Sequence, residues 1–148
     1  MKKRCINRLS FTLPAVSENE SVARSLVAAF ISLPDPTIEE LADVRCAVSE
    51  AVTNAIVHGY RGTKGEVYIS VKLYDDRTVR IEVRDKGVGI ADIEEARRPL
   101  FTTDESGERS GMGFAVMEAF TDRLCVFSQK GHGTRVVLEK RLSNTKDG

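Results

Sequence analysis

Hydrophobic residues recur with two periodicities along the first part of the chain, one typical of strands and one typical of helices. Apolar and polar residues alternate over residues 6–13, which predicts a strand. Two Ser/Thr-x-x-Glu patterns follow, at residues 17–20 and 37–40, and each is typical of a capping box at the start of a helix. The first predicted helix has an apolar side made of Val22, Leu26, Ala29, Phe30 and Leu33. The second should end near Gly59 and has an apolar side made of Leu41, Val44, Val48, Val52 and Ile56.

The second part of the chain is dominated by short alternating segments. Residues 67–73 and 79–83 predict a hairpin, with its turn at residues 75–77. Residues 85–113 are rich in glycine and charge and have no firm periodicity, and a short helix is predicted over residues 112–120. Two further strands are predicted before and after a glycine-containing turn. The whole pattern favours an α+β fold, a two-layer α/β sandwich whose sheet is mixed but mostly antiparallel, with the helices on one face.

Length and composition indicate one globular domain. The chain has 148 residues, of which 41% are hydrophobic and 30% charged, so it is too apolar for disorder. We expect a single domain over residues 1–141, followed by a polar tail over residues 142–148. The 22 basic and 22 acidic residues cancel, which argues against a general nucleic-acid-binding protein. The three cysteines have no Cys-x-x-Cys spacing, and no apolar run could cross a membrane, so we expect a cytoplasmic protein without a membrane partner.

The second predicted helix carries the first candidates for chemistry. Glu50, Asn54 and His58 are four residues apart and therefore lie along one side of a helix. The side-chain oxygen of Asn54 suits a hard cation such as Mg²⁺, and the Glu50 carboxylate is suited to accept a proton. The alternative interpretation is an ordinary exposed polar face. We expect His58 to have a structural role at the helix end.

Asp85 and three Gly-x-Gly pairs are the next candidates. Asp85 follows an apolar strand, where its carboxylate is placed either to accept a hydrogen bond from the amino group of a base or to form a local turn. The glycine pairs lie at residues 87–89, 111–113 and 131–133, and none belongs to a GxGxxG or GxxxxGK[ST] loop. Each pair alone is compatible with a turn, because glycine is the usual residue where φ is positive.

In combination and in this order, the motifs resemble those of the GHKL ATPase/kinase superfamily, which has the Bergerat ATP-binding fold. The Glu50-x3-Asn54 segment is similar to the N box of that superfamily. The glycine-containing segments that begin at Asp85, Gly111 and Gly131 are similar to its G1, G2 and G3 boxes. The resemblance spans about residues 40 to 138.

Three longer segments, at residues 49–58, 97–103 and 108–114, resemble sporulation anti-sigma F factors, which are serine-protein kinases of this superfamily. The pattern shows no phosphoacceptor-histidine dimerisation helix, so we expect a stand-alone kinase domain rather than a sensor histidine kinase. The resemblance implies ATP or ADP with Mg²⁺ as cofactors. It implies as partners a sigma factor, an anti-anti-sigma protein that is phosphorylated on serine, and a second copy in a homodimer, with Arg24 on the first helix as a candidate contact.

The resemblance also implies a role for each matching residue. Asp85 would read the adenine amino group, with Thr134 supporting it through water. Asn54 would bind Mg²⁺ that bridges the phosphates. Glu50 would take the proton of the attacking serine hydroxyl, and Arg109 would neutralise charge on the transferred γ-phosphoryl group. The glycines would hinge and floor a lid over residues 92–113, namely Gly87, Gly89, Gly111 and Gly113.

Functions from two different classes remain open at this point. The first is an enzyme, a Mg²⁺- and ATP-dependent serine kinase that inactivates an anti-anti-sigma protein. The second is an ATP-gated module that binds a sigma factor, as in general stress-response systems, with little or no phosphotransfer. Glu50 distinguishes them, because binding alone has little need of a carboxylate at that position. A stand-alone ATP hydrolase is a third, weaker alternative.

Overall fold

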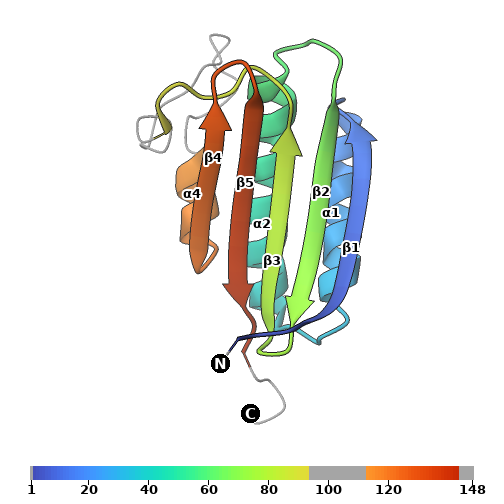
Figure 1. The fold of residues 1–148 in the computed structure, drawn as a ribbon. Coiled ribbons are helices and arrows are strands. Elements are labelled where there is room, and N and C mark those ends of the chain that lie inside the picture. Colours follow the sequence, from blue (N-terminus) through green and yellow to red (C-terminus); the bar gives the residue numbers. More distant parts are fainter. Residues whose placement is uncertain (1, 94–112, 144–148) are drawn as a thin grey trace.

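An antiparallel sheet forms one layer of the protein and helices form the other (Figure 1). The computed structural model describes residues 2–93 and 113–143. The strands are β1 (Cys5–Pro14), β2 (Glu66–Tyr74), β3 (Thr78–Asp85), β4 (Arg123–Gln129) and β5 (Gly133–Arg141). The helices are α1 (Glu18–Ile31), α2 (Ile38–Thr53), the π-helix η1 (Asn54–Gly59) and α4 (Gly113–Ala119). Each element predicted from the sequence in these ranges is present, and the α+β two-layer fold is confirmed.

The strand order is β1-β2-β3-β5-β4, and every neighbouring pair in the described residues is antiparallel. The prediction of a mixed sheet was therefore wrong for these strands. After β1 the chain passes through α1, α2 and η1 and then returns as β2, which pairs with β1 in antiparallel orientation. The predicted hairpin between β2 and β3 is present, and Arg77 in its turn has a positive φ of 68°.

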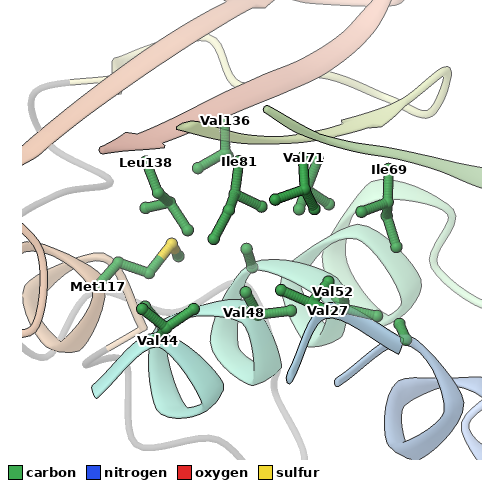
Figure 2. Close-up of a cluster of buried hydrophobic side chains, with 14 of the residues drawn as sticks. Val27, Val44, Val48, Val52, Ile69, Val71, Ile81, Met117, Val136 and Leu138 are labelled. Carbon is green, nitrogen blue, oxygen red and sulfur yellow. The ribbon is translucent and has the colours of Figure 1, made fainter. Parts of the chain in front are cut away.

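The core lies between one face of the sheet and the helices, which all cover that same face (Figures 1 and 2). Alternate residues of the strands point into it, because side chains in a strand alternate between the two faces. On the helix side the predicted stripe is buried except for Leu41, which is partly buried, and Met117 of α4 fills the space beside Val44 and Leu138. Figure 2 shows the residues that meet there from the sheet, which include Ile69, Val71, Ile81, Val136 and Leu138.

Helix α1 buries a different face from the one predicted. Its buried residues are Ala23, Val27 and Ile31. The predicted apolar positions are largely on the outside: Val22 is 43% exposed and Leu33 is 69% exposed. The two stripes are one residue apart, which is about 100° around a helix, so the hydrophobic pattern alone did not decide which of them meets α2. Helix α1 therefore presents an apolar strip to its surroundings.

The two predicted capping boxes have different outcomes. Around Thr37 both bonds form, because the Glu40 amide donates to the Thr37 hydroxyl over 3.0 Å and the Thr37 amide donates to the Glu40 carboxylate over 2.9 Å. The box at Ser17 is absent, since Ser17 is itself helical and its side chain makes no capping bond. Glu20 instead accepts a hydrogen bond from the Ser49 hydroxyl of α2 and lies 3.7 Å from the Arg24 guanidinium. The tertiary contact between the helices replaces the local one.

The packed part of the chain extends past the last strand. Leu142 is buried in the core, and its amide donates to the carbonyl of Arg77 over 3.0 Å. The Ser143 amide donates to Glu40 over 2.7 Å. The packed body therefore includes these two residues, which the sequence pattern assigned to the tail. In the described parts of the chain, no helix is both long and apolar enough to span a membrane.

Candidate functional site

The candidate site lies where α2 ends, and the last part of this helix is wider than an α-helix. Residues Asn54–Gly59 form the π-helix η1, which follows α2 without a break. Such π-helical turns are rare and occur often at functional sites. The same end of the sheet holds the end of β3 and the turn between β4 and β5 (Figure 1). Several polar side chains therefore converge there from separate parts of the sequence.

Glu50 and Asn54 face the start of α4. A Cβ added to Gly113 would lie 3.1 Å from both terminal atoms of the Asn54 side chain and 3.4 Å from Glu50 Oε2. The predicted helical spacing of Glu50 and Asn54 therefore does place both side chains on one side, toward the last glycine of the second Gly-x-Gly pair. Because Gly113 has no side chain, its backbone approaches this pair closely. His58 lies in the last turn of η1 and is partly buried.

Asp85 is the acidic residue that the structure buries most fully among those described. It is the last residue of β3 and only 5% exposed. Burial raises the pKa of its carboxyl group, while the backbone N–H groups of Gly87 and Thr134 oppose that increase. The Gly87 amide donates to Asp85 Oδ1 over 2.9 Å. This bond is compatible with the local turn considered from the sequence, and a buried carboxylate of this kind is well suited to accept a hydrogen bond from a ligand donor.

Thr134 is adjacent to Asp85 across the sheet. The two residues are directly paired in the β3–β5 ladder, and Thr134 is also buried. Its hydroxyl is 2.8 Å from the Ser128 hydroxyl of β4, which in turn bonds to the amide of Ile90 over 2.7 Å. Ser128 was not singled out from the sequence. The available signal was its place in β4, because it follows Leu124 and Val126 on the inner face of that strand.

A close backbone approach ties η1 to the segment after β3. A Cβ added to Gly59 would lie 2.8 Å from the carboxyl carbon of Asp85, and one added to Gly87 would collide with the Gly59 carbonyl. The Val88 amide donates to that same carbonyl over 2.8 Å. Gly59 was predicted only as a helix end, so its second role beside Asp85 was missed. These two glycines bring the end of the helix and the start of the Gly-x-Gly loop into direct contact.

Tyr60 is a second residue that the sequence pattern did not single out. Its hydroxyl donates to the Glu66 carbonyl and accepts from the Lys86 amide over 2.9 Å. The Tyr60 hydroxyl therefore links the first residue of β2 to the residue that follows Asp85. A lone tyrosine after a glycine carries no sequence signal for such a link.

The second glycine of two pairs has a backbone conformation that side chains disfavour. Gly89 has a φ of 75° and Gly133 has a φ of 97°. Both also pack against backbone, at Gln129 for Gly89 and at Asp85 for Gly133. Gly89 and Gly133 therefore have the positive φ that we expected of glycines in turns, and both lie next to the candidate site. Arg109, Gly111 and most of the expected lid, residues 94–112, lie outside the described residues.

A hollow of about 660 Å³ lies at the opposite end of the sheet from Asp85 and Asn54. It is lined by residues of the β2–β3 turn, the start of β4 and the end of β5, namely Asp75, Asp76, Arg77, Asp122, Arg141, Leu142 and Ser143. None of the residues implicated by the sequence motifs contributes to it. The polar convergence at the end of α2, rather than this hollow, is therefore the candidate site.

Comparison with known proteins places the chain among ATPase-like proteins. Residues 13–140 match the family described as "Histidine kinase-like ATPase domain". The anti-sigma F factor of Bacillus licheniformis is 52% identical over 141 residues, which cover 95% of this chain and 96% of that protein.

Solved structures have the same fold at lower sequence identity. The RsbU and RsbW domains of Rv1364c from Mycobacterium tuberculosis match with a TM-score of 0.68 and 24% identity, over 93% of this chain and 33% of that one. Full-length ShkA in complex with AMPPNP matches with a TM-score of 0.59 and 17% identity, over 97% of this chain and 32% of that one.

Proposed function

Because the chain belongs to the anti-sigma F factor family and has a histidine kinase-like ATPase domain, we propose that it binds and inhibits a sporulation sigma factor. We propose further that it is a protein-serine kinase, which uses ATP to phosphorylate and thereby inactivate an anti-anti-sigma protein. The observation that carries the proposal is the convergence of Glu50, Asn54 and Gly113 at one end of the domain, with buried Asp85 at the same end.

Asp85 is assigned to the adenine base. Its buried carboxylate accepts from the Gly87 amide through one oxygen, and a carboxylate has further lone pairs that can accept from an exocyclic amino group. The buried hydroxyl of Thr134 lies beside it and is suited to bond the base directly or through water. This arrangement favours adenine, which presents an amino donor, over guanine, which presents an oxygen in the corresponding place.

Asn54 is assigned to Mg²⁺ and the phosphates. Among the described residues no cluster of three or more His, Cys, Asp or Glu could hold a metal ion. Mg²⁺ in nucleotide sites usually keeps several waters and is held by one or two protein oxygens together with the phosphates, so a single amide oxygen from Asn54 beside Gly113 fits that chemistry. When bound, the ion would neutralise charge on the phosphate oxygens.

Glu50 is assigned to the serine proton. In the proposed transfer the serine oxygen forms a bond to the γ-phosphorus, and the bond from that phosphorus to the bridging oxygen of ADP breaks. The serine proton passes to the Glu50 carboxylate, which faces the same glycine as Asn54. Arg109, predicted from the sequence, would offset charge on the transferred group. Most of the acceleration would come from positioning and electrostatics rather than from proton transfer.

Helix α1 is assigned to protein contacts. Its outer side has exposed Val22 and Leu26, and an exposed apolar strip is suited to a protein interface. Arg24 is partly exposed on a different side of the helix, because residues two positions apart do not share a face, and both sides belong to the surface of α1. We propose that this surface serves the homodimer and the sigma factor, with Arg24 as a contact. The bond from Glu20 to Ser49 connects α1 to the residue just before Glu50.

The kinase assignment is tested with γ-labelled ATP, Mg²⁺ and a candidate anti-anti-sigma protein. The comparison is between the wild type and Glu50→Gln, which keeps the size of the side chain and one acceptor oxygen but removes the carboxylate that would take the proton. We expect label on a serine of the partner with the wild type and little or none with the variant, while both bind ATP equally. Equal ATP binding without label in either protein would instead support the alternative, an ATP-gated module that sequesters the sigma factor.

A further inference from the structure

The face of the sheet that points away from the helices carries an unusual arrangement of charge. No described helix covers this face, and Figure 1 looks directly onto it. Its side chains alternate with core residues such as Val71 and Ile81 along the strands. The strand register aligns them in rows across the sheet, and one row consists of Arg8, Lys72, Arg80, Glu139 and Arg123.

Three cations in this row are immediate neighbours. Arg8 is paired with Lys72, and Lys72 is paired with Arg80 on the next strand. Neighbouring strands are about 4.8 Å apart, and like charges directly opposite one another destabilise a sheet. The nearby Glu139 carboxylate lies 3.8 Å from the ammonium of Lys3. Among the described residues, no ion pair neutralises Arg8, Lys72 or Arg80, and Arg80 Nε is buried without a hydrogen-bond partner.

A second row repeats the arrangement. Arg84 is directly paired with Arg135, so two guanidinium groups again lie on adjacent strands. Arg135 is 3.0 Å from Glu82, whereas Arg84 lies over the ring of Tyr68 at 4.9 Å. A row with one charged residue, Glu82, lies between these two rows and consists of Ser10, Ser70, Glu82, Val137 and Cys125. Together the three rows carry six basic and two acidic side chains, in a protein whose total charge is zero. The fold therefore concentrates positive charge on this face.

We infer that this outer face is a docking surface for an acidic segment of a partner protein. A neutral protein gains nothing in stability from like charges placed side by side, whereas a row of carboxylates laid across the strands would neutralise them. The surface lies on the opposite side of the sheet from the core and from α1, so it is separate from the contacts proposed above. It does not depend on nucleotide binding or on kinase activity.

The aromatic side chains of this face favour a protein segment over a nucleic acid. Single-stranded nucleic acids bind by stacking their bases on exposed rings. Here the ring of Tyr68 already lies under Arg84 and Lys86, at 4.9 and 5.0 Å, and the ring of Phe127 lies under Arg135 at 4.4 Å.

The test uses the full-length protein and a fluorescent peptide of about twenty glutamates, followed by fluorescence anisotropy at low and moderate salt. The test variant is the double substitution Lys72→Gln with Arg80→Gln. The matched control is Arg45→Gln with Lys64→Gln, which removes the same charge from exposed positions elsewhere. We expect salt-sensitive binding that is about tenfold weaker in the test variant and within twofold of wild type in the control.

A thermal melt of the same proteins distinguishes a docking role from a structural one. Removing neighbouring like charges should leave the test variant at least as stable as the wild type. The inference is overturned if the peptide does not bind, if both double variants lose affinity equally, or if the test variant keeps its affinity. Tighter binding of a twenty-nucleotide oligothymidine or of phosphatidylglycerol vesicles, with the same residue dependence, would also overturn it, by assigning the face to nucleic acid or membrane.

Discussion

Asp85→Asn tests two consequences of burying a carboxylate at the end of β3. One is the proposed hydrogen bond to adenine, and the other is a dependence of protein stability on pH. The substitution preserves the shape of the side chain and an oxygen that can accept from the Gly87 amide. It removes the charge that we assign to adenine recognition and introduces an N–H donor that faces the donor of the base. A hydrogen bond to a charged group contributes about 1.5–3 kcal/mol, and an unpaired donor costs about 1–3 kcal/mol. A total loss of about 3 kcal/mol weakens ATP binding by about 100-fold.

The same substitution should change how the stability of the protein without nucleotide depends on pH. Burial raises the Asp85 pKa in the folded state above the unfolded value of about 3.9. The stability associated with the protonated group is therefore fully present below the unfolded pKa and is lost as the pH rises through the folded pKa. The variant has no such loss, so its stability relative to the wild type should be lowest near pH 4, increase with pH and then level off.

Calorimetric titration with ATP and thermal melts from pH 4 to pH 8 measure both effects. Glu39→Gln is the control, because Glu39 is an exposed carboxylate at the opposite end of α2. The reasoning is refuted if the Asp85→Asn variant binds ATP within threefold of the wild type. A difference in melting temperature that does not change with pH would refute the explanation by burial, even if ATP binding were lost.

Three further predictions concern the site and the helix caps. Gly113→Ala should slow phosphotransfer about tenfold by displacing Asn54, while a melt shows equal or higher stability because alanine favours a helix. Asn54→Ala should remove the Mg²⁺ dependence of ATP affinity in titrations with and without Mg²⁺, and an unchanged dependence would exclude it as the ligand. Thr37→Ala should cost about 1 kcal/mol in denaturant unfolding, whereas Ser17→Ala should cost less than about 0.5 kcal/mol; equal costs would contradict the observed caps.

Local patterns predicted the elements well because each of them is encoded by neighbouring residues. The alternation in β2 and β3 and the stripe of α2 appear in the structure as buried faces. Two features depend on tertiary contacts instead. The covered side of α1 is set by its contact with α2, and Glu20 bonds to Ser49 rather than closing the box at Ser17. The π-helical end of α2 also has no counterpart in hydrophobic spacing.

The sequence predicted the arrangement of candidate site residues where they are close together in one helix. Glu50 and Asn54 are one helical turn apart, and the structure places both beside Gly113. The contact between Gly59 and Asp85 joins segments that are distant in the sequence, so neither segment alone indicates it. The same is true of Ser128, whose hydroxyl approaches Thr134 only because β4 and β5 are paired.

The location of the nucleotide site is the central claim, and an NMR titration of ¹⁵N-labelled protein with Mg²⁺ and ADP tests it most directly. The account predicts saturable shifts of backbone amides around Asp85, at Gly59, Gly87 and Thr134, and at Gly113 beside Asn54. These shifts should be absent in Asp85→Asn at the same ADP concentration. Shifts centred instead on the hollow at the other end of the sheet, at residues 75–77 and 141–143, would contradict the account.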